Sequence, residues 1–251
     1  MRNLLQALIA LAWVRTRGRV VWLFVLLISL ACALLLGRLG QRVSASLYLD
    51  TRDAGAYVPL IAAKATLWGP GVLAVLFTSV RAWAKDSEEG ILALVRHAGH
   101  DPARYLRARG VVLALVLIAL QLLTLAAVHA MARTPLHGTL PALAYGVAGS
   151  VVLALLGAVC LGPRQRPGGT LLLWTLLFGP EILSVWTTRI VARELSSIPA
   201  LLETTALAVG PEAMDGARLT RALLALTLLA LALALWLRVA TRRWVQKQVT
   251  A

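Results

Sequence analysis

The residues with the greatest chemical reactivity are few, and their spacing predicts no catalytic centre. His97 and His100 could begin a metal or haem site, but glycine lies between them and no third ligand follows. A second pair, His129 and His137, also lacks a third ligand. Ser150 follows a glycine in an apolar run, as in an intramembrane protease, yet the last apolar run holds no histidine to activate it. We therefore predict no catalytic residue and no metal site.

The sequence contains no nucleotide-binding loop. Such a loop ends in Gly-Lys-Ser/Thr, because backbone amides and one lysine hold the phosphates. The lysines are Lys64, Lys85 and Lys247, and none of them follows a glycine. If ATP drives this protein, we expect another chain to hydrolyse it.

One carboxylate, Glu181, is predicted deep in an apolar run. It follows Gly179-Pro180, and a proline beside a glycine can open the backbone around an ion or substrate. Two interpretations remain open: Glu181 carries a coupling ion, or it lines a water-accessible vestibule and caps a helix. Pro70, Pro180 and Glu181 are the candidate residues of a substrate path or outer gate.

A polar segment, residues 81–110, separates two long apolar runs. It carries Asp86, Glu88 and Glu89 just before Gly90. An apolar ridge follows, made of Ile91, Leu92, Leu94 and Val95. Acidic residues complement the start of a helix, so we expect them to cap the ridge. An exposed ridge needs burial, and we predict that these eight residues bind a groove on a soluble partner.

The composition is that of a polytopic membrane protein. Hydrophobic residues make up 59% of the 251 residues, against about 45–50% in soluble chains. Lipid tolerates only helices and closed barrels, and continuous Leu/Ala runs without alternation exclude a barrel. The net charge of +14 does not predict nucleic-acid binding, because basic residues flank apolar runs instead of forming one basic domain. The predicted fold is all-α.

The apolar runs predict one transmembrane domain, 1–251, with six spans. The spans lie at 20–37, 59–82, 111–132, 140–162, 170–188 and 222–237. Residues 3–14 are predicted to form an interfacial helix. A cytoplasmic loop at 83–110 follows the second span. An outer amphipathic segment at 189–221 contains a short helix near 199–209.

Several positions inside the spans predict local geometry. Gly69-Pro70-Gly71 predicts a kink or break in the second span. The fifth span is expected to bend at Gly179-Pro180 and finish near Thr188, or to dip and return. Lys64 is expected to snorkel to the interface. The fourth span offers small residues for close helix packing, at Gly146, Gly149, Ser150 and Gly157.

The basic residues predict the orientation. With both termini in the cytoplasm, 16 of the 25 Lys and Arg residues lie inside and nine outside. Cytoplasmic loops carry the excess of Lys and Arg in membrane proteins, so the termini are predicted to be cytoplasmic.

The chain resembles the ABC-2 type permease family over essentially its whole length. The specific part is the run from Trp83 to Leu94, in which an aromatic and basic span end precedes acids, a glycine and an apolar helix. Pro70-Gly-Val72, and Arg166-Pro-Gly-Gly169 leading to Pro180, are similar to the haem-exporter permease branch of that fold. The family often has a proline eight to ten residues after the glycine, whereas here the next proline is Pro102.

The resemblance implies a subunit of an ATP-driven exporter in the cytoplasmic (inner) membrane of a bacterium. It implies a homodimer, or a pair with a related permease, in contact with lipid and with a separate cytoplasmic ABC ATPase. The chain itself is then no enzyme and carries no cofactor, since ATP is bound by the partner. Segment 83–110 holds the coupling helix that the ATPase pushes. The cargo stays open among lipid-linked glycans, drugs, peptides, haem-related and motility-linked molecules.

Two other classes of function fit part of the pattern. A membrane anchor that docks a cytoplasmic partner without transport shares every feature except the two Gly-Pro interruptions. An ion-coupled secondary transporter would use Glu181. A P-loop ATPase gene beside the gene of this chain would separate these readings.

Overall fold

The computed structural model describes residues 6, 10–11, 25–29, 31, 35, 51–79, 82–132, 136–161, 167–187, 197–207 and 216–250. In these ranges the chain is helical and has no strand. The elements are α3 (Thr51–Thr66), the π-helical turn η1 (Leu67–Gly71), α4 (Val72–Ser79), α5 (Ala82–Glu88), α6 (Ile91–His97), α7 (Pro102–Ala132), α8 (Leu136–Leu161), α9 (Pro167–Thr187), α10 (Ile198–Leu207) and α11 (Gly216–Thr250). The predicted helix 3–14 and span 20–37 lie mostly outside the described residues.

Four helical stretches of the described chain are long and apolar enough to cross a membrane, as expected of an integral membrane protein. They are Val58–Ser79, Pro102–Met131, Thr139–Leu161 and Thr220–Gln246, and they correspond to the second, third, fourth and sixth predicted spans. The fifth predicted span coincides with α9, whose apolar stretch, Gly168–Gly179, is shorter.

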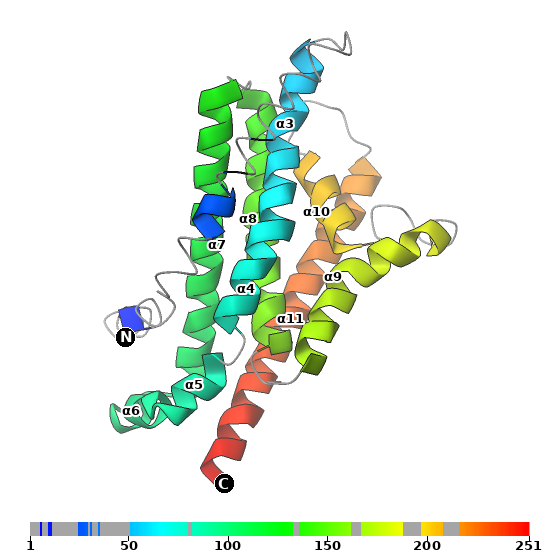
Figure 1. Cartoon of the computed structure of the whole chain (residues 1–251). Helices are drawn as coiled ribbons and strands as arrows, with labels where there is room; N and C mark the ends of the chain where they lie inside the picture. Colours follow the sequence, from blue (N-terminus) through cyan, green and yellow to red (C-terminus); the bar gives the residue numbers. More distant parts are fainter. Residues whose placement is uncertain are drawn as a thin grey trace.

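The helices form a bundle centred on α8. α8 contacts α3, α7, α9, α10 and α11. α3 and α8 run in the same direction, and α7 lies against both in the opposite direction (Figure 1). One end of the bundle, here called the foot, holds α5, α6, the start of α7 and the C-terminal end of α11 (Figure 1).

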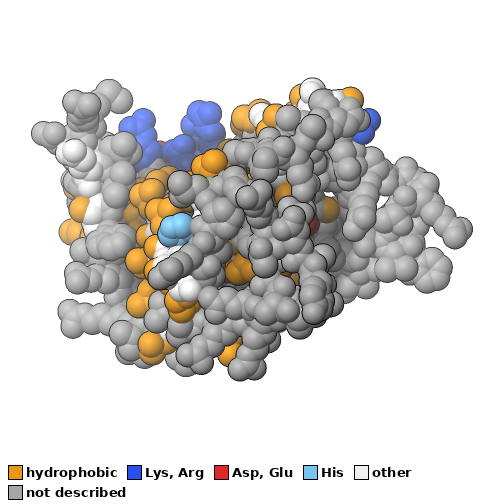
Figure 2. All heavy atoms as spheres, turned by 90° about the horizontal axis from the view of Figure 1, so that it is seen from above, with side chains coloured by type: hydrophobic (Ala, Val, Ile, Leu, Met, Phe, Trp, Pro, Cys, Tyr) orange, Lys and Arg blue, Asp and Glu red, His pale blue; other side chains and the backbone are white. Residues whose placement is uncertain are grey.

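The outer surface of the bundle is apolar. Leu115, Leu123 and Leu228 are 52%, 55% and 58% exposed. Seen from above, hydrophobic side chains occupy much of the described surface, and Lys and Arg gather toward one edge (Figure 2). An exposed apolar surface of this kind is suited to lipid or to a neighbouring helix.

Small residues of α8 admit neighbouring helices, as predicted. A Cβ on Gly149 would overlap Leu67 of η1, and a Cβ on Gly157 would overlap Val75 of α4. On the α7 side, a Cβ on Gly146 would lie 3.2 Å from the Gln121 side chain. Glycine lets these helices approach closely, so packing replaces the hydrophobic effect that is missing between helices in lipid.

The predicted interruption at Gly69-Pro70-Gly71 is a π-helical turn. η1 spans Leu67–Gly71 between α3 and α4, with Pro70 buried. Proline has no amide to continue the α-helical hydrogen bonds, and one wider turn absorbs that defect. Gly71 suits this turn, because a Cβ would lie 3.1 Å from the Thr66 carbonyl oxygen, which is tighter than an ordinary contact.

The helix α9 does not break at the second Gly-Pro pair. It continues through Pro180 to Thr187, close to the predicted end near Thr188. Figure 1 shows α9 rising beside α11 and then bending away from the bundle. A bend fits the proline, whose ring disturbs the preceding turn without ending the helix.

In two predicted segments the structure defines the helices and their boundaries more closely. The loop 83–110 contains α5, α6 and the first turns of α7, because α7 begins at Pro102 and not at 111. Asp101 precedes it and accepts a hydrogen bond from the Ala103 amide at 2.9 Å, and proline suits the first helical position. Within 189–221, the short helix is confirmed as α10, but it packs against α8 and α11, with Leu201 and Leu202 buried.

Candidate functional site

The acidic residues of the polar segment end one helix, and the apolar ridge begins the next. α5 ends at Glu88, Gly90 adopts a left-handed conformation (φ 71°), and α6 starts at Ile91. The Gly90 amide donates to the Ser87 carbonyl oxygen at 3.0 Å, so this glycine closes α5. No side chain caps α6. The predicted cap is therefore wrong, and the segment 82–97 forms a two-helix elbow, named here the α5–α6 elbow.

Asp86 holds the elbow to α7. Its side chain is 2% exposed and forms an ion pair with the Arg109 guanidinium, which is 12% exposed. The Tyr105 hydroxyl donates to the same carboxylate at 3.0 Å. Tyr105 and Arg109 are four residues apart, which places both on one face of α7. A buried carboxylate held in this way stabilises the protein's own fold, and the Asp86 side chain is not exposed at the surface of the elbow.

The apolar ridge is divided between the inside and the outside. Leu92 and Val95 are buried, at 9% and 3% exposure, whereas Leu94 is 61% exposed and Ile91 is partly buried. The buried pair packs in the foot cluster, whose other buried members are Tyr105, Leu106, Ala108, Val112, Ala158, Val159, Leu237 and Trp244. Burying a Leu or Val side chain contributes about 1.5–3 kcal/mol. Leu92 and Val95 of the ridge thus stabilise the foot, whereas Leu94 is exposed.

The outward surface of the elbow combines charge with this leucine. Lys85 of α5 pairs with Glu89 at 3.7 Å, with side-chain exposures of 68% and 39%. Glu88 is exposed beside them. An exposed i,i+4 pair contributes little to stability. The remaining predicted partner-binding residues, Glu88, Glu89, Gly90 and Leu94, are therefore on a surface that can make contacts without disturbing the fold.

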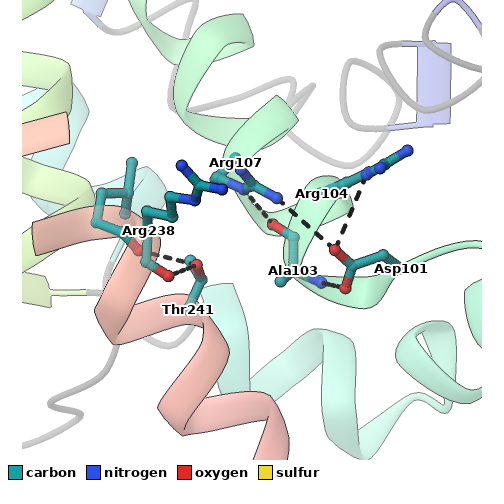
Figure 3. A network of polar contacts seen from close by, with 7 residues as sticks. Asp101, Ala103, Arg104, Arg107, Arg238 and Thr241 are labelled. Carbon is teal, nitrogen blue, oxygen red and sulfur yellow. Dashed lines mark hydrogen bonds and ion pairs between the residues drawn. The ribbon is translucent and has the colours of Figure 1, made fainter. Parts of the chain in front are cut away.

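A basic network lies next to the elbow, at the start of α7. The Asp101 carboxylate lies 3.7 Å from the Arg107 guanidinium and 4.0 Å from that of Arg104. Arg107 also donates to the Ala103 carbonyl oxygen at 3.1 Å. Arg238 extends toward Arg107 from α11 (Figure 3). This end of the bundle therefore has more cations than anions among the described side chains.

A second polar group joins α3, α8 and α10. Lys64 of α3 pairs with Glu203 of α10 at 2.6 Å, and its ammonium lies 6.0 Å from the centre of the Tyr145 ring. The Trp68 indole donates to the Tyr145 hydroxyl at 2.6 Å. The side chains of Lys64 and Glu203 are 31% and 40% exposed, so the ion pair lies at the edge of the packed helices. Lys64 belongs to a stretch that is apolar enough to cross a membrane, and ionisable residues in such stretches mark functional candidates.

Three buried polar atoms near this group lack a hydrogen-bond partner: Thr66 Oγ1, Gln121 Oε1 and Ser150 Oγ. Gln121 uses its amide nitrogen to contact the Ala63 carbonyl oxygen at 3.4 Å. Buried Thr124 and Thr241 instead bond the carbonyl oxygen four residues earlier. Thr66 directly precedes η1, so its hydroxyl lies where the helical pattern changes.

The predicted gate residues are only partly described. Pro70 is buried within η1, beside the buried residues of α8. Pro180 and Glu181 are helical within α9, but their side chains lie outside the described part of the structure. In the described residues, no three His, Cys, Asp or Glu side chains come together as a metal site.

Sequence reasoning missed Tyr105, Arg109 and Glu203. The spacing of Tyr105 and Arg109 at i and i+4 was a visible signal, since it gives one helix face two groups that suit a carboxylate. Glu203 had no such signal, because its partner is far away in the sequence. Compared with known protein families, curated proteins and solved structures, the chain has no match.

Proposed function

We propose that this chain is the permease subunit of an ATP-driven exporter of ABC-2 type. In this proposal it has six spans, both termini lie in the cytoplasm, and residues 3–14 form an interfacial helix. It functions as a homodimer, or with a related permease, in the cytoplasmic membrane of a bacterium. A separate ATPase chain binds and hydrolyses the ATP.

The α5–α6 elbow carries the proposal. A permease without a nucleotide site needs a rigid contact that receives force from its ATPase. The elbow lies at the foot and exposes Leu94, Glu88 and Glu89, while the buried Asp86–Arg109 pair fixes it to α7. A push on the elbow therefore acts on a helix long enough to cross the membrane. Such coupling requires that the elbow and its partner contact each other differently in two states.

A polar group between helices favours transport over a plain anchor. An anchor needs apolar helices and a docking surface, but it has no need for an ion pair between α10 and Lys64, which lies in a stretch apolar enough to cross the membrane. The same pair is the observation that favours the secondary-transporter alternative, in which Glu181 would be a further ionisable group. That alternative requires transport to follow an ion gradient without any ATPase.

The decisive experiment changes Leu94 to aspartate. Leu94 is 61% exposed, so the fold should survive, whereas a charge forced into an apolar interface costs several kcal/mol. About 3 kcal/mol corresponds to roughly a hundredfold loss of affinity. We expect Leu94→Asp to insert and purify normally, but to lose co-purification of the P-loop ATPase chain that this proposal requires.

Two control variants make the experiment specific. Gln246→Asp adds the same charge at the foot on α11, outside the elbow, and should retain the ATPase. Leu94→Ile keeps the apolar surface and should also retain it. Wild-type recovery of the ATPase by Leu94→Asp would exclude the elbow as the coupling site. Retained binding without ATP-dependent transport by the wild-type pair would favour the anchor.

A further inference from the structure

We infer that Arg107 and Arg238 form a binding site for the phosphate-bearing headgroup of an anionic membrane lipid, in the angle between α7 and α11 at the foot. This site is separate from the α5–α6 elbow. It does not require that the chain be a transporter.

Packing brings the two arginines together. Leu106 and Val112 of α7 share the foot cluster with Leu237 and Trp244 of α11. Arg107 and Arg238 are the next residues after Leu106 and Leu237, at the edge of this contact. Figure 3 shows the Arg238 side chain extending from α11 toward Arg107.

The local charges do not balance. Asp101 lies 3.7 Å from Arg107 and 4.0 Å from Arg104, so one carboxylate serves two guanidinium groups. Asp86 already forms an ion pair with Arg109. The Arg238 guanidinium makes no hydrogen bond or ion pair with a residue that the structure describes. Two guanidinium groups that approach each other repel, and an anion between them removes that repulsion. Their fork of N–H donors matches a phosphate.

Exposed apolar side chains of α11 and α7 extend along the bundle toward the two arginines. Leu231 and Leu235, 55% and 60% exposed, precede Arg238 by seven and three residues and therefore share its face of α11. On α7, Val111 and Leu115 are both 52% exposed. α11 is the least buried of the four apolar helices, with 17% of its apolar stretch buried. Acyl chains can lie along these surfaces while the headgroup reaches the arginines.

The position selects a lipid over a soluble phosphate. Both arginines lie at one end of helices that are long and apolar enough to cross the bilayer. Lipid phosphates lie at that depth, and basic sites between such helices bind anionic headgroups. A soluble anion would gain nothing from the exposed leucines beside the arginines.

The test measures lipid binding to the full chain in a neutral detergent by native mass spectrometry. The probes are phosphatidylglycerol, zwitterionic phosphatidylcholine and inorganic phosphate. We expect preferential binding of phosphatidylglycerol, which Arg238→Gln should weaken about fivefold, because one basic residue near an anionic surface contributes that much. Arg107→Gln should weaken it similarly. Millimolar inorganic phosphate should displace little of the lipid.

Arg243→Gln is the matched control. Arg243 is an exposed arginine on the same helix, five residues from Arg238 and therefore on a different face. It should change binding less than twofold. Equal losses in Arg243→Gln and Arg238→Gln would show a general charge effect and overturn the site, as would unchanged binding in Arg238→Gln. Full displacement by phosphate would make the ligand a soluble anion. Loss of ATPase binding with lipid binding intact would assign the arginines to a protein partner.

Discussion

Alanine in place of Arg109 would leave the Asp86 carboxylate buried without its cation. The Asp86 side chain is 2% exposed, so water cannot replace the guanidinium. Removing one partner of a buried ion pair costs about 3–5 kcal/mol. The Tyr105 hydrogen bond at 3.0 Å remains, and we therefore expect the lower value, about 3 kcal/mol, for opening of the elbow.

Hydrogen exchange in the purified full chain measures this effect locally. Amides of α5 and α6 should exchange up to about a hundredfold faster in Arg109→Ala, while amides of α8 stay protected, because only the foot opens. Lys85→Ala is the matched control: it breaks an exposed pair of 3.7 Å and should change exchange less than about threefold.

The double variant tests the reasoning further. Adding Asp86→Ala to Arg109→Ala removes the lone buried charge, so the double variant should be no less stable than Arg109→Ala alone. Additive losses would show that the two residues act independently. Equal exchange in wild type and Arg109→Ala would refute the conclusion that this pair fixes the elbow to α7.

Two further predictions concern the bundle. Lys64→Met should lower the thermal unfolding midpoint in detergent slightly, because Glu203 loses its 2.6 Å partner; the two side chains are 31% and 40% exposed, so the ion pair contributes no more than about 1 kcal/mol. Glu203→Gln in the same chain should restore part of the loss, and a greater loss in the double variant would contradict the pairing. Gly157→Ala should destabilise the chain by about 1–3 kcal/mol, because its Cβ would overlap Val75, whereas Gly168→Ala, with open space around it, should not; equal midpoints of the two variants would exclude close packing at Gly157.

The long helices were predictable because lipid imposes a simple requirement. A predominantly apolar run of about 20 residues must satisfy its own backbone in the bilayer, and four such runs are found as apolar helices. The small residues of α8 were predictable for a related reason, since close approach in lipid requires them. The interruption at η1 was also predictable, because Pro70 cannot donate the backbone hydrogen bond that an α-helix needs.

The ends of the helices and the ion pairs were harder to predict from the sequence. Hydropathy marks where lipid ends, not where a helix ends, so the basic first turns of α7 were read as loop. Asp101-Pro102 was an unused signal for a helix start. Asp86 was taken for a surface residue because nothing local shows that Arg109 neutralises it. Leu92 is buried and Leu94 exposed because Leu92 packs in the foot cluster, whose members include Leu237 and Trp244, more than a hundred residues away in the sequence.

The uninterrupted length of α7 has a mechanical consequence. Its 31 residues form a rod of about 45 Å, and Gln121, which is closer to Ala132 than to Pro102, lies against Gly146. If that contact is the fulcrum, a tilt of about 5° moves Pro102 by roughly 2.5 Å and Ala132 by about half as much in the opposite direction. α7 is then a lever: displacement of the foot is delivered to the far side of the bundle, reversed and reduced, without any helix having to bend.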